Sequence, residues 1–158
     1  MNWGIGPAAG PVRKQYQNSP VGLWYWEFPY DADVYLLSQL RLPSSYDGAT
    51  APALTATYWF DDNTTTEDFA LVLYHGDGAT GIMPDRPADL ALGNGVTALL
   101  SPTATAGQFQ SETFSMTTNT FAAGAELLLA FKVDTANPSF DATHALCLGD
   151  CNLAISVA

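Results

Sequence analysis

The sequence predicts an all-β fold, an antiparallel, jelly-roll-like β-sandwich of about eight strands with an extended N-terminal arm. Three observations favour this fold class. Side chains recur with a period of two in residues 52–60 and 69–76, as they do in strands. The other apolar segments are short and are separated by turn residues, at the spacing typical of sandwiches and barrels. No apolar period of 3.6 residues continues for eleven residues or more.

Residues 52–76 form the centre of the predicted fold. In their first half, Tyr58 and Phe60 fall on one face, whereas Trp59 falls on the other beside threonines. The connector 61–67 reads DDNTTTE, and Asp, Asn and Thr favour turns because their side chains bond nearby backbone groups. We therefore expect two neighbouring antiparallel strands here.

Residues 1–20 are predicted to be an extended arm, and residues 21–158 to be the sandwich domain. The glycines and prolines of the arm argue against a helix and against an isolated strand. Trp3, Ile5 and Tyr16 are sizeable side chains, spaced as if to dock on a surface. A terminus of this composition is ordered only where its own body or a neighbour holds it.

The strands predicted outside residues 52–76 show the same alternation of side chains and are separated by turn residues. Phe109 and Phe114 differ in parity, which predicts a bulge between them. Residues 76–107 are broken repeatedly by glycine and proline and are the least regular part. The strands predicted outside the central pair are 21–30, 34–42, 96–100, 108–117, 126–133 and 151–157.

The formal charge of −11 is unevenly distributed. Arg13 and Lys14 give the arm +2, whereas residues 21–158 hold 3 basic and 16 acidic side chains, a net of −13. An acidic body argues against binding to nucleic acid or to an anionic membrane. Charged residues make up only 13% of the chain, and such a neutral surface suits packing against other protein.

No targeting or membrane segment is predicted. The N-terminus lacks a basic stretch followed by an apolar one, and no apolar run approaches the ~18 residues of a membrane span. We therefore expect synthesis in a cytoplasm. Two cysteines are too few for a disulfide scaffold.

One group of soft metal ligands is close in sequence. His144, Cys147 and Cys151 lie within eight residues, but a structural zinc site needs four ligands and no C-x-x-C pair is present. We predict no metal site. The two cysteines flank residues 148–150, which resemble a tight turn, so they either form a disulfide or remain free thiols.

The sequence marks out no catalytic residues. Asp61, Asp62 and Asn63 are consecutive and lack the spacing of a calcium loop, so turn chemistry explains them better. Acidic residues are plentiful, but nothing singles out two carboxylates for glycoside hydrolysis. Nucleophile and phosphate-binding motifs are absent. We predict no enzyme activity and no cofactor.

The order of the segments resembles a group of tailed-phage virion proteins built on a jelly-roll sandwich. In that group, aromatic strands lead into a YDG turn, then a Thr-rich strand, then a strand bearing Trp or Tyr. The likeness covers roughly residues 22–157, departs from the group at the Cys147–Cys151 turn, and excludes residues 1–20. The segments that carry it are LWYWEFPY, SYDG, PALTATYWF, DFALVLYHG, ELLLAFKVD and CNLAISVA.

This resemblance implies a structural virion protein, foremost a capsid decoration or cement protein that binds the major capsid protein or other virion proteins and stabilises the shell. Trp3, Ile5 and Tyr16 would anchor the arm in a groove between capsid subunits, and Arg13 and Lys14 would pair with acidic groups there. We expect a homo-oligomer, trimer or dimer, located in the virion and made in the host cytoplasm.

The alternative is a head- or tail-fibre module that binds a receptor or a glycan. It requires an exposed aromatic platform, because aromatic rings stack on sugars. Trp59, on the threonine face of its strand, is the aromatic side chain that we expect to be exposed. A hydrolase acting on host polysaccharide is a third hypothesis, without assigned residues.

Overall fold

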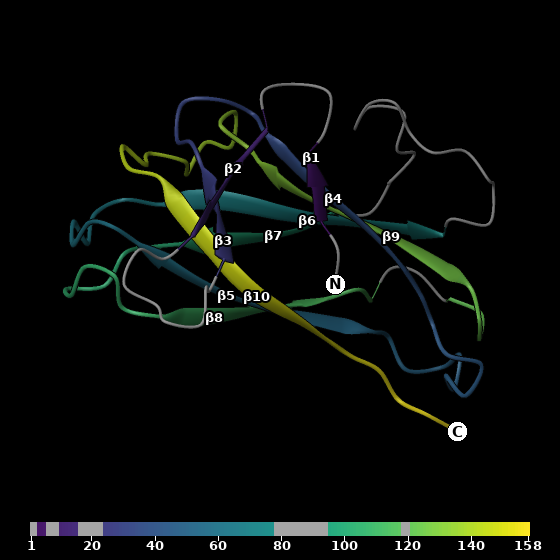
Figure 1. The fold of residues 1–158 in the computed structure, drawn as a ribbon. Coiled ribbons are helices and arrows are strands. Elements are labelled where there is room, and N and C mark those ends of the chain that lie inside the picture. Colours follow the sequence, from purple (N-terminus) through teal and green to yellow (C-terminus); the bar gives the residue numbers. More distant parts are fainter. Residues whose placement is uncertain (1–2, 6–9, 16–23, 78–94, 118–120) are drawn as a thin grey trace.

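The computed structural model describes residues 3–5, 10–15, 24–77, 95–117 and 121–158 of the 158-residue chain. These residues form strands and loops, with no helix that could span a membrane. The strands build two sheets packed face to face, which confirms the predicted all-β sandwich (Figure 1). Their bounds are β1 Trp3–Ile5, β2 Val12–Gln15, β3 Trp24–Phe28, β4 Tyr35–Arg41, β5 Ala53–Phe60, β6 Phe69–Asp77, β7 Gly95–Leu100, β8 Gln110–Ser115, β9 Glu126–Val133 and β10 Leu146–Ala154.

Each sheet has five strands within the described residues. Sheet A has the order β1-β4-β9-β6-β7, and sheet B has the order β2-β3-β10-β5-β8. All neighbouring strands are antiparallel. The last strand, β10, therefore lies in the middle of sheet B, between β3 and β5.

The predicted pairing of the central strands is wrong. Strand β5 lies in sheet B and β6 lies in sheet A, so the two strands are not neighbours in one sheet. The connector 61–68 carries the chain from one sheet to the other. Phe60 at the end of β5 contacts Phe69 at the start of β6 with ring centroids 6.1 Å apart. The alternation of side chains within β5 and within β6 is as predicted. The apolar faces of the two strands, however, meet across the core, because the strands belong to different sheets.

The core lies between the sheets and is rich in aromatic rings. Phe114 of β8 packs edge to face on Phe131 of β9, with centroids 5.3 Å apart. Both side chains are fully buried, as are Phe60 and Phe69. Removing this apolar surface from water, together with the ring contacts, stabilises the packing of sheet B on sheet A.

The described parts of the N-terminal segment, residues 3–5 and 10–15, contain two strands that pair with the body. Strand β1 pairs with β4 at the edge of sheet A, and β2 pairs with β3 at the edge of sheet B. Gly4 lies within β1, opposite Leu37 of β4, and Pro11 directly precedes β2. The body itself therefore holds this segment.

A bulge is present in β10, not in β8. Strand β8 pairs with β5 without interruption from Gln110 to Ser115, and Phe109 lies just before it. In β10 the register against β5 shifts between Leu148 and Cys151. Residues 148–150, which we expected to be a tight turn, are therefore a bulge within a continuous strand.

Asp33 ties the loop before β4 to the end of β9. Its carboxylate accepts hydrogen bonds from the backbone N–H and the hydroxyl of Thr135, at 2.9 and 2.8 Å, and pairs with Lys132 Nζ at 3.1 Å. Burial opposes ionisation, but these hydrogen bonds and the Lys132 charge together bring the pKa of Asp33 below its ordinary value.

We predict that Phe131→Ala lowers the free energy of unfolding by about 3 to 5 kcal/mol, because it leaves a cavity between the two sheets. Urea unfolding followed by circular dichroism measures this change. Leu99→Ala, on β7 and 48% exposed, is the control and should change the free energy by less than about 1 kcal/mol. Equal losses in the two variants would show that the core is not where the structure places it.

We predict that Asp33→Asn destabilises the protein by about 1 kcal/mol at neutral pH and has little effect in strong acid. The folded pKa of Asp33 is depressed, so its contribution is present above the unfolded pKa and is lost as the pH falls through the folded pKa. Urea midpoints of both proteins at about pH 7 and about pH 2 test this. A difference that is the same at both pH values would contradict it.

Candidate functional site

Three aromatic side chains form a row on the outer face of sheet B, which is the face turned away from the core. We call Tyr25 of β3, Trp59 of β5 and Phe109, just before β8, the aromatic row. The Trp59 ring lies 5.0 Å from the Tyr25 ring and 5.0 Å from the Phe109 ring, edge to face in both cases. Residues far apart in sequence thus form one continuous row of contacting aromatic rings.

Trp59 points outward because Tyr58 and Phe60 point into the core. Our expectation that Trp59 is exposed is wrong, however: only 7% of it is accessible. Tyr25 and Phe109 flank the ring, and it lies over Gly149 of β10, where an added Cβ would come within 3.0 Å of it. Phe109, which we considered only as a sign of a bulge and not as a site residue, is 60% exposed.

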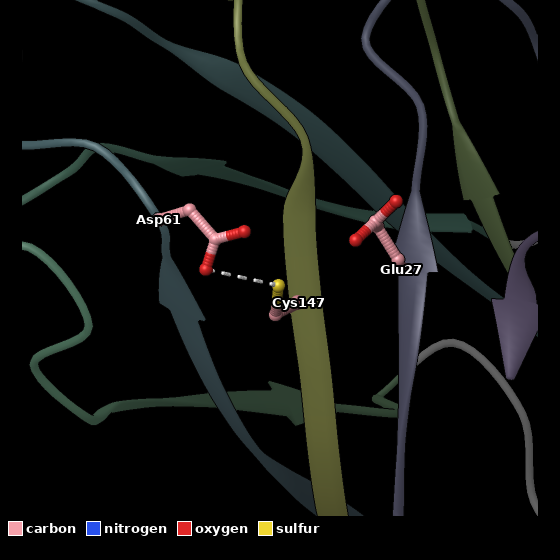
Figure 2. A group of neighbouring side chains, drawn as sticks. All are labelled: Glu27, Asp61 and Cys147. Carbon is pink, nitrogen blue, oxygen red and sulfur yellow. Dashed lines mark hydrogen bonds between the residues drawn. The ribbon is translucent and has the colours of Figure 1, made fainter. Parts of the chain in front are cut away.

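A charged group borders the aromatic row. Figure 2 shows Cys147 of β10 between Asp61, which follows β5, and Glu27 of β3. Glu27 Oε2 lies 2.5 Å from Lys14 Nζ, and the Cys147 thiol lies 4.0 Å from Asp61 Oδ1. We call Lys14, Glu27 and Asp61 the charged end of the face.

The Cys147 side chain is fully buried beneath this charged end. Burial, and secondarily the charge of Asp61, raises the pKa of the Cys147 thiol far above its ordinary value. A thiol must lose its proton to bind a metal strongly, and Glu27 is already paired with Lys14. The group therefore suits hydrogen bonding better than metal binding.

Hydroxyl groups line the rest of the outer face, between β5 and β8. Thr55 and Thr113 face each other across the two strands, with their hydroxyl oxygens 2.9 Å apart. Thr57 and Ser111 form the next pair toward the aromatic row. The face therefore offers aromatic rings, carboxylates and hydroxyls within a few strand spacings of one another.

The cations of the N-terminal segment have partners inside the chain. Arg13 stacks over the Trp24 ring, 4.5 Å from its centroid, and Lys14 pairs with Glu27. Both positive charges therefore have a partner within the chain, and neither requires an acidic group on a capsid. Trp3 and Ile5 lie in β1, of which the structure describes the backbone, and Tyr16 lies outside the described residues.

His144 does not join the cysteines. Cys147 lies on the outer face, whereas Cys151 packs against the core, and both thiols are free. His144 instead contacts Glu67 and Asp62, two acids of the connector between β5 and β6. The hydrogen bond with Glu67 raises the pKa of His144, burial acts in the opposite direction, and the two carboxylate charges add to the rise. No sequence pattern links these three positions.

No protein-family model and no curated protein matches this chain. Solved structures do. TmCBM61, described in complex with β-1,4-galactotriose, is similar over 98% of this chain and 88% of its own, with a TM-score of 0.55 and 12% identity. The CBM22-1 xylan-binding domain of Paenibacillus barcinonensis Xyn10C is similar over 99% and 86%, with a TM-score of 0.50 and 11% identity. At these identities the likeness shows a shared fold.

This comparison contradicts the prediction of a capsid decoration protein. The two structures just described match along nearly the whole chain and are a carbohydrate-binding module and a xylan-binding domain, not virion proteins. Alternating strands, a YDG turn and a Thr-rich strand reflect the jelly-roll fold, and one fold serves many functions. The pattern therefore predicted the architecture correctly and the biological role wrongly.

We predict that neither thiol reacts readily with iodoacetamide in the folded protein near neutral pH. Cys147 is fully buried, and burial raises the pKa of Cys151 to about 12, so little thiolate is present. Mass spectrometry should find both cysteines labelled only after unfolding in denaturant. Rapid labelling of the folded protein would contradict the burial, and failure to label the unfolded protein would reveal a disulfide.

Proposed function

We propose that this domain binds a neutral oligosaccharide across the outer face of sheet B and does not hydrolyse it. The observation that carries this proposal is the aromatic row of Tyr25, Trp59 and Phe109 beside hydrogen-bonding side chains on an open sheet face. It replaces the capsid prediction and agrees with the alternative of a glycan-binding module.

The rings would supply the apolar half of the interaction. A pyranose ring has faces of C–H groups that pack on an aromatic ring, and amphipathic ligands are commonly held by aromatic surfaces with a few placed polar groups. Phe109, 60% exposed, would make the direct contact. The Trp59 ring is nearly covered, so it would not contact the sugar directly. Its edge-to-face contact with Phe109 would instead hold the Phe109 ring in position.

The charged end and the threonine and serine hydroxyls of β5 and β8 would supply the polar contacts with the sugar. Carboxylates of Glu27 and Asp61 accept hydrogen bonds from sugar hydroxyls, and Thr57 and Ser111 can donate or accept. The charged end carries one cation and two anions, so it disfavours acidic glycans. A neutral sugar chain is the ligand class that fits.

The shared fold supports this proposal. The similar structures include a module bound to β-1,4-galactotriose and a xylan-binding domain, so both sugars are suitable first probes. Binding without hydrolysis is proposed because both nearby carboxylates have partners within the protein. Lys14 pairs with Glu27, and the Cys147 thiol contacts Asp61.

We predict that Phe109→Ala weakens binding of the recognised oligosaccharide about tenfold, which is a loss of about 1.4 kcal/mol. A glycan array that includes β-1,4-galactan and xylan oligosaccharides would identify the ligand, and titration calorimetry would measure its affinity. The exposed position of Phe109 makes this variant unlike Trp59→Ala, which also removes a buried ring.

Tyr30→Ala is the matched control, because Tyr30 is a 43% exposed aromatic side chain outside the aromatic row. It should bind as the natural protein does. The proposal fails if no neutral glycan binds, or if both variants retain full affinity. Release of reducing sugar from a bound oligosaccharide would refute the non-hydrolytic part.

A further inference from the structure

A second group of polar side chains lies away from the aromatic row, where two loops meet. Asp62 and Glu67 belong to the connector between β5 and β6, and His144 lies just before β10. His144 Nδ1 is 2.9 Å from Glu67 Oε1 and 3.1 Å from Asp62 Oδ2. One ligand atom from each residue lies within 4.8 Å of the other two. We call these residues the carboxylate–histidine cluster.

The hydrogen bonds within this cluster leave two buried carboxylate oxygens without a hydrogen-bond donor. A single nitrogen, His144 Nδ1, faces both carboxylates and can donate one hydrogen at most. Glu67 Oε2 and Asp62 Oδ2 are inaccessible to solvent, and among the residues that the structure describes none donates a hydrogen bond to either atom, although Asp62 Oδ2 lies 3.1 Å from His144 Nδ1. The Glu67 side chain is only 5% exposed, so water does not solvate this charge. An unpartnered buried carboxylate oxygen is costly and calls for a cation.

Thr143 fixes the orientation of Glu67. Its hydroxyl donates to Glu67 Oε1, the same oxygen that faces His144, while Oε2 accepts no hydrogen bond from the described part of the chain. A hydroxyl that positions a carboxylate in this way is typical of the groups that surround metal ligands. Thr143 therefore fixes the Glu67 carboxylate in place, yet one oxygen of that carboxylate still lacks a hydrogen-bond donor.

We propose that the carboxylate–histidine cluster binds a divalent transition-metal ion, represented by Zn²⁺, through His144 Nδ1 and one carboxylate oxygen each of Asp62 and Glu67. Tetrahedral zinc with ligand bonds of ~2.0 to ~2.1 Å has ligand–ligand distances of about 3.3 Å. The observed separations of 2.9 and 3.1 Å lie within a few tenths of an ångström of that value. The other oxygen of a carboxylate, or a water, completes the coordination.

The ligand types select the metal. Calcium and magnesium prefer shells made of oxygen, whereas an imidazole nitrogen beside carboxylates suits zinc and its neighbours in the first transition row. His144 is 49% exposed and provides a route of entry for the ion. The group of Glu27, Asp61 and Cys147 is a weaker candidate because its thiol is protonated and Lys14 occupies Glu27.

Metal binding here would join the β5–β6 connector to the loop that leads into β10. These loops adjoin strands that carry Trp59 and Cys147 on the outer face of sheet B. The metal proposal does not depend on glycan binding, and its test uses no sugar.

The test begins with purified protein freed of metal by a chelator. Titration calorimetry with zinc chloride alone should show one ion bound per chain, and the melting temperature should rise with zinc concentration because zinc binds only the folded site. His144→Gln and Glu67→Gln should each weaken zinc binding at least tenfold. Absence of zinc binding by the natural protein would overturn the proposal.

Two controls separate this cluster from other groups. Asp31→Asn removes an exposed carboxylate elsewhere, and Cys151→Ser removes a free thiol; both variants should bind zinc as the natural protein does. If Cys151→Ser loses the ion, or if His144→Gln and Glu67→Gln both retain it, the proposal is wrong. Circular dichroism confirms that each variant is folded.

Cobalt provides a second readout that does not depend on the variants' stability. Co²⁺ bound by one nitrogen and oxygen ligands in a four-coordinate site gives visible d–d absorption without the near-ultraviolet band of a cobalt–thiolate bond. We expect that spectrum, with the absorption removed by excess zinc. A thiolate band, or a preference for calcium over zinc in competition, would overturn the assignment.

Discussion

The two faces of strand β5 govern both the stability and the chemistry of this domain. Tyr58 and Phe60 are held in the core, and the strict alternation of side chains then directs Trp59 to the outer face of sheet B. A slip of one residue would exchange the two sets, placing the threonines in the core and the aromatic rings of the core in water. Core packing therefore determines which side chains are available for binding.

Strand β10 shapes the outer face as much as β5 does. It lies between β3 and β5, so its side chains fill the space beneath the aromatic row. Gly149 leaves room for the Trp59 ring, and the buried thiol of Cys147 is bracketed by the carboxylates of Glu27 and Asp61. The bulge between Leu148 and Cys151 then returns Cys151 to the core. A local irregularity thus separates two cysteines that the sequence places close together.

The N-terminal strands show how composition can mislead. Glycine and proline argued against an isolated strand in this segment, yet β1 and β2 each add an edge strand to one sheet. Lys14 and Arg13 reach Glu27 and Trp24 on the neighbouring strand, and such contacts are available only once β2 lies beside β3. The positive charges of Arg13 and Lys14 suggested an external acidic partner, but both side chains contact β3 at the edge of sheet B.

The sequence by itself determined the all-β class, the face of β5 that carries Trp59, and the eight strands from β3 to β10, with the start of β10 misplaced by several residues. These features depend on alternation within a few residues, which the chain displays directly. Only the tertiary structure decided that β5 and β6 face each other across the core, that Phe109 completes the aromatic row, and that His144 meets Glu67, 77 positions away. Those contacts depend on the order of strands in the two sheets. Backbone hydrogen bonds and apolar burial between distant segments set that order, and the alternation of side chains within one strand does not indicate which other strand it pairs with.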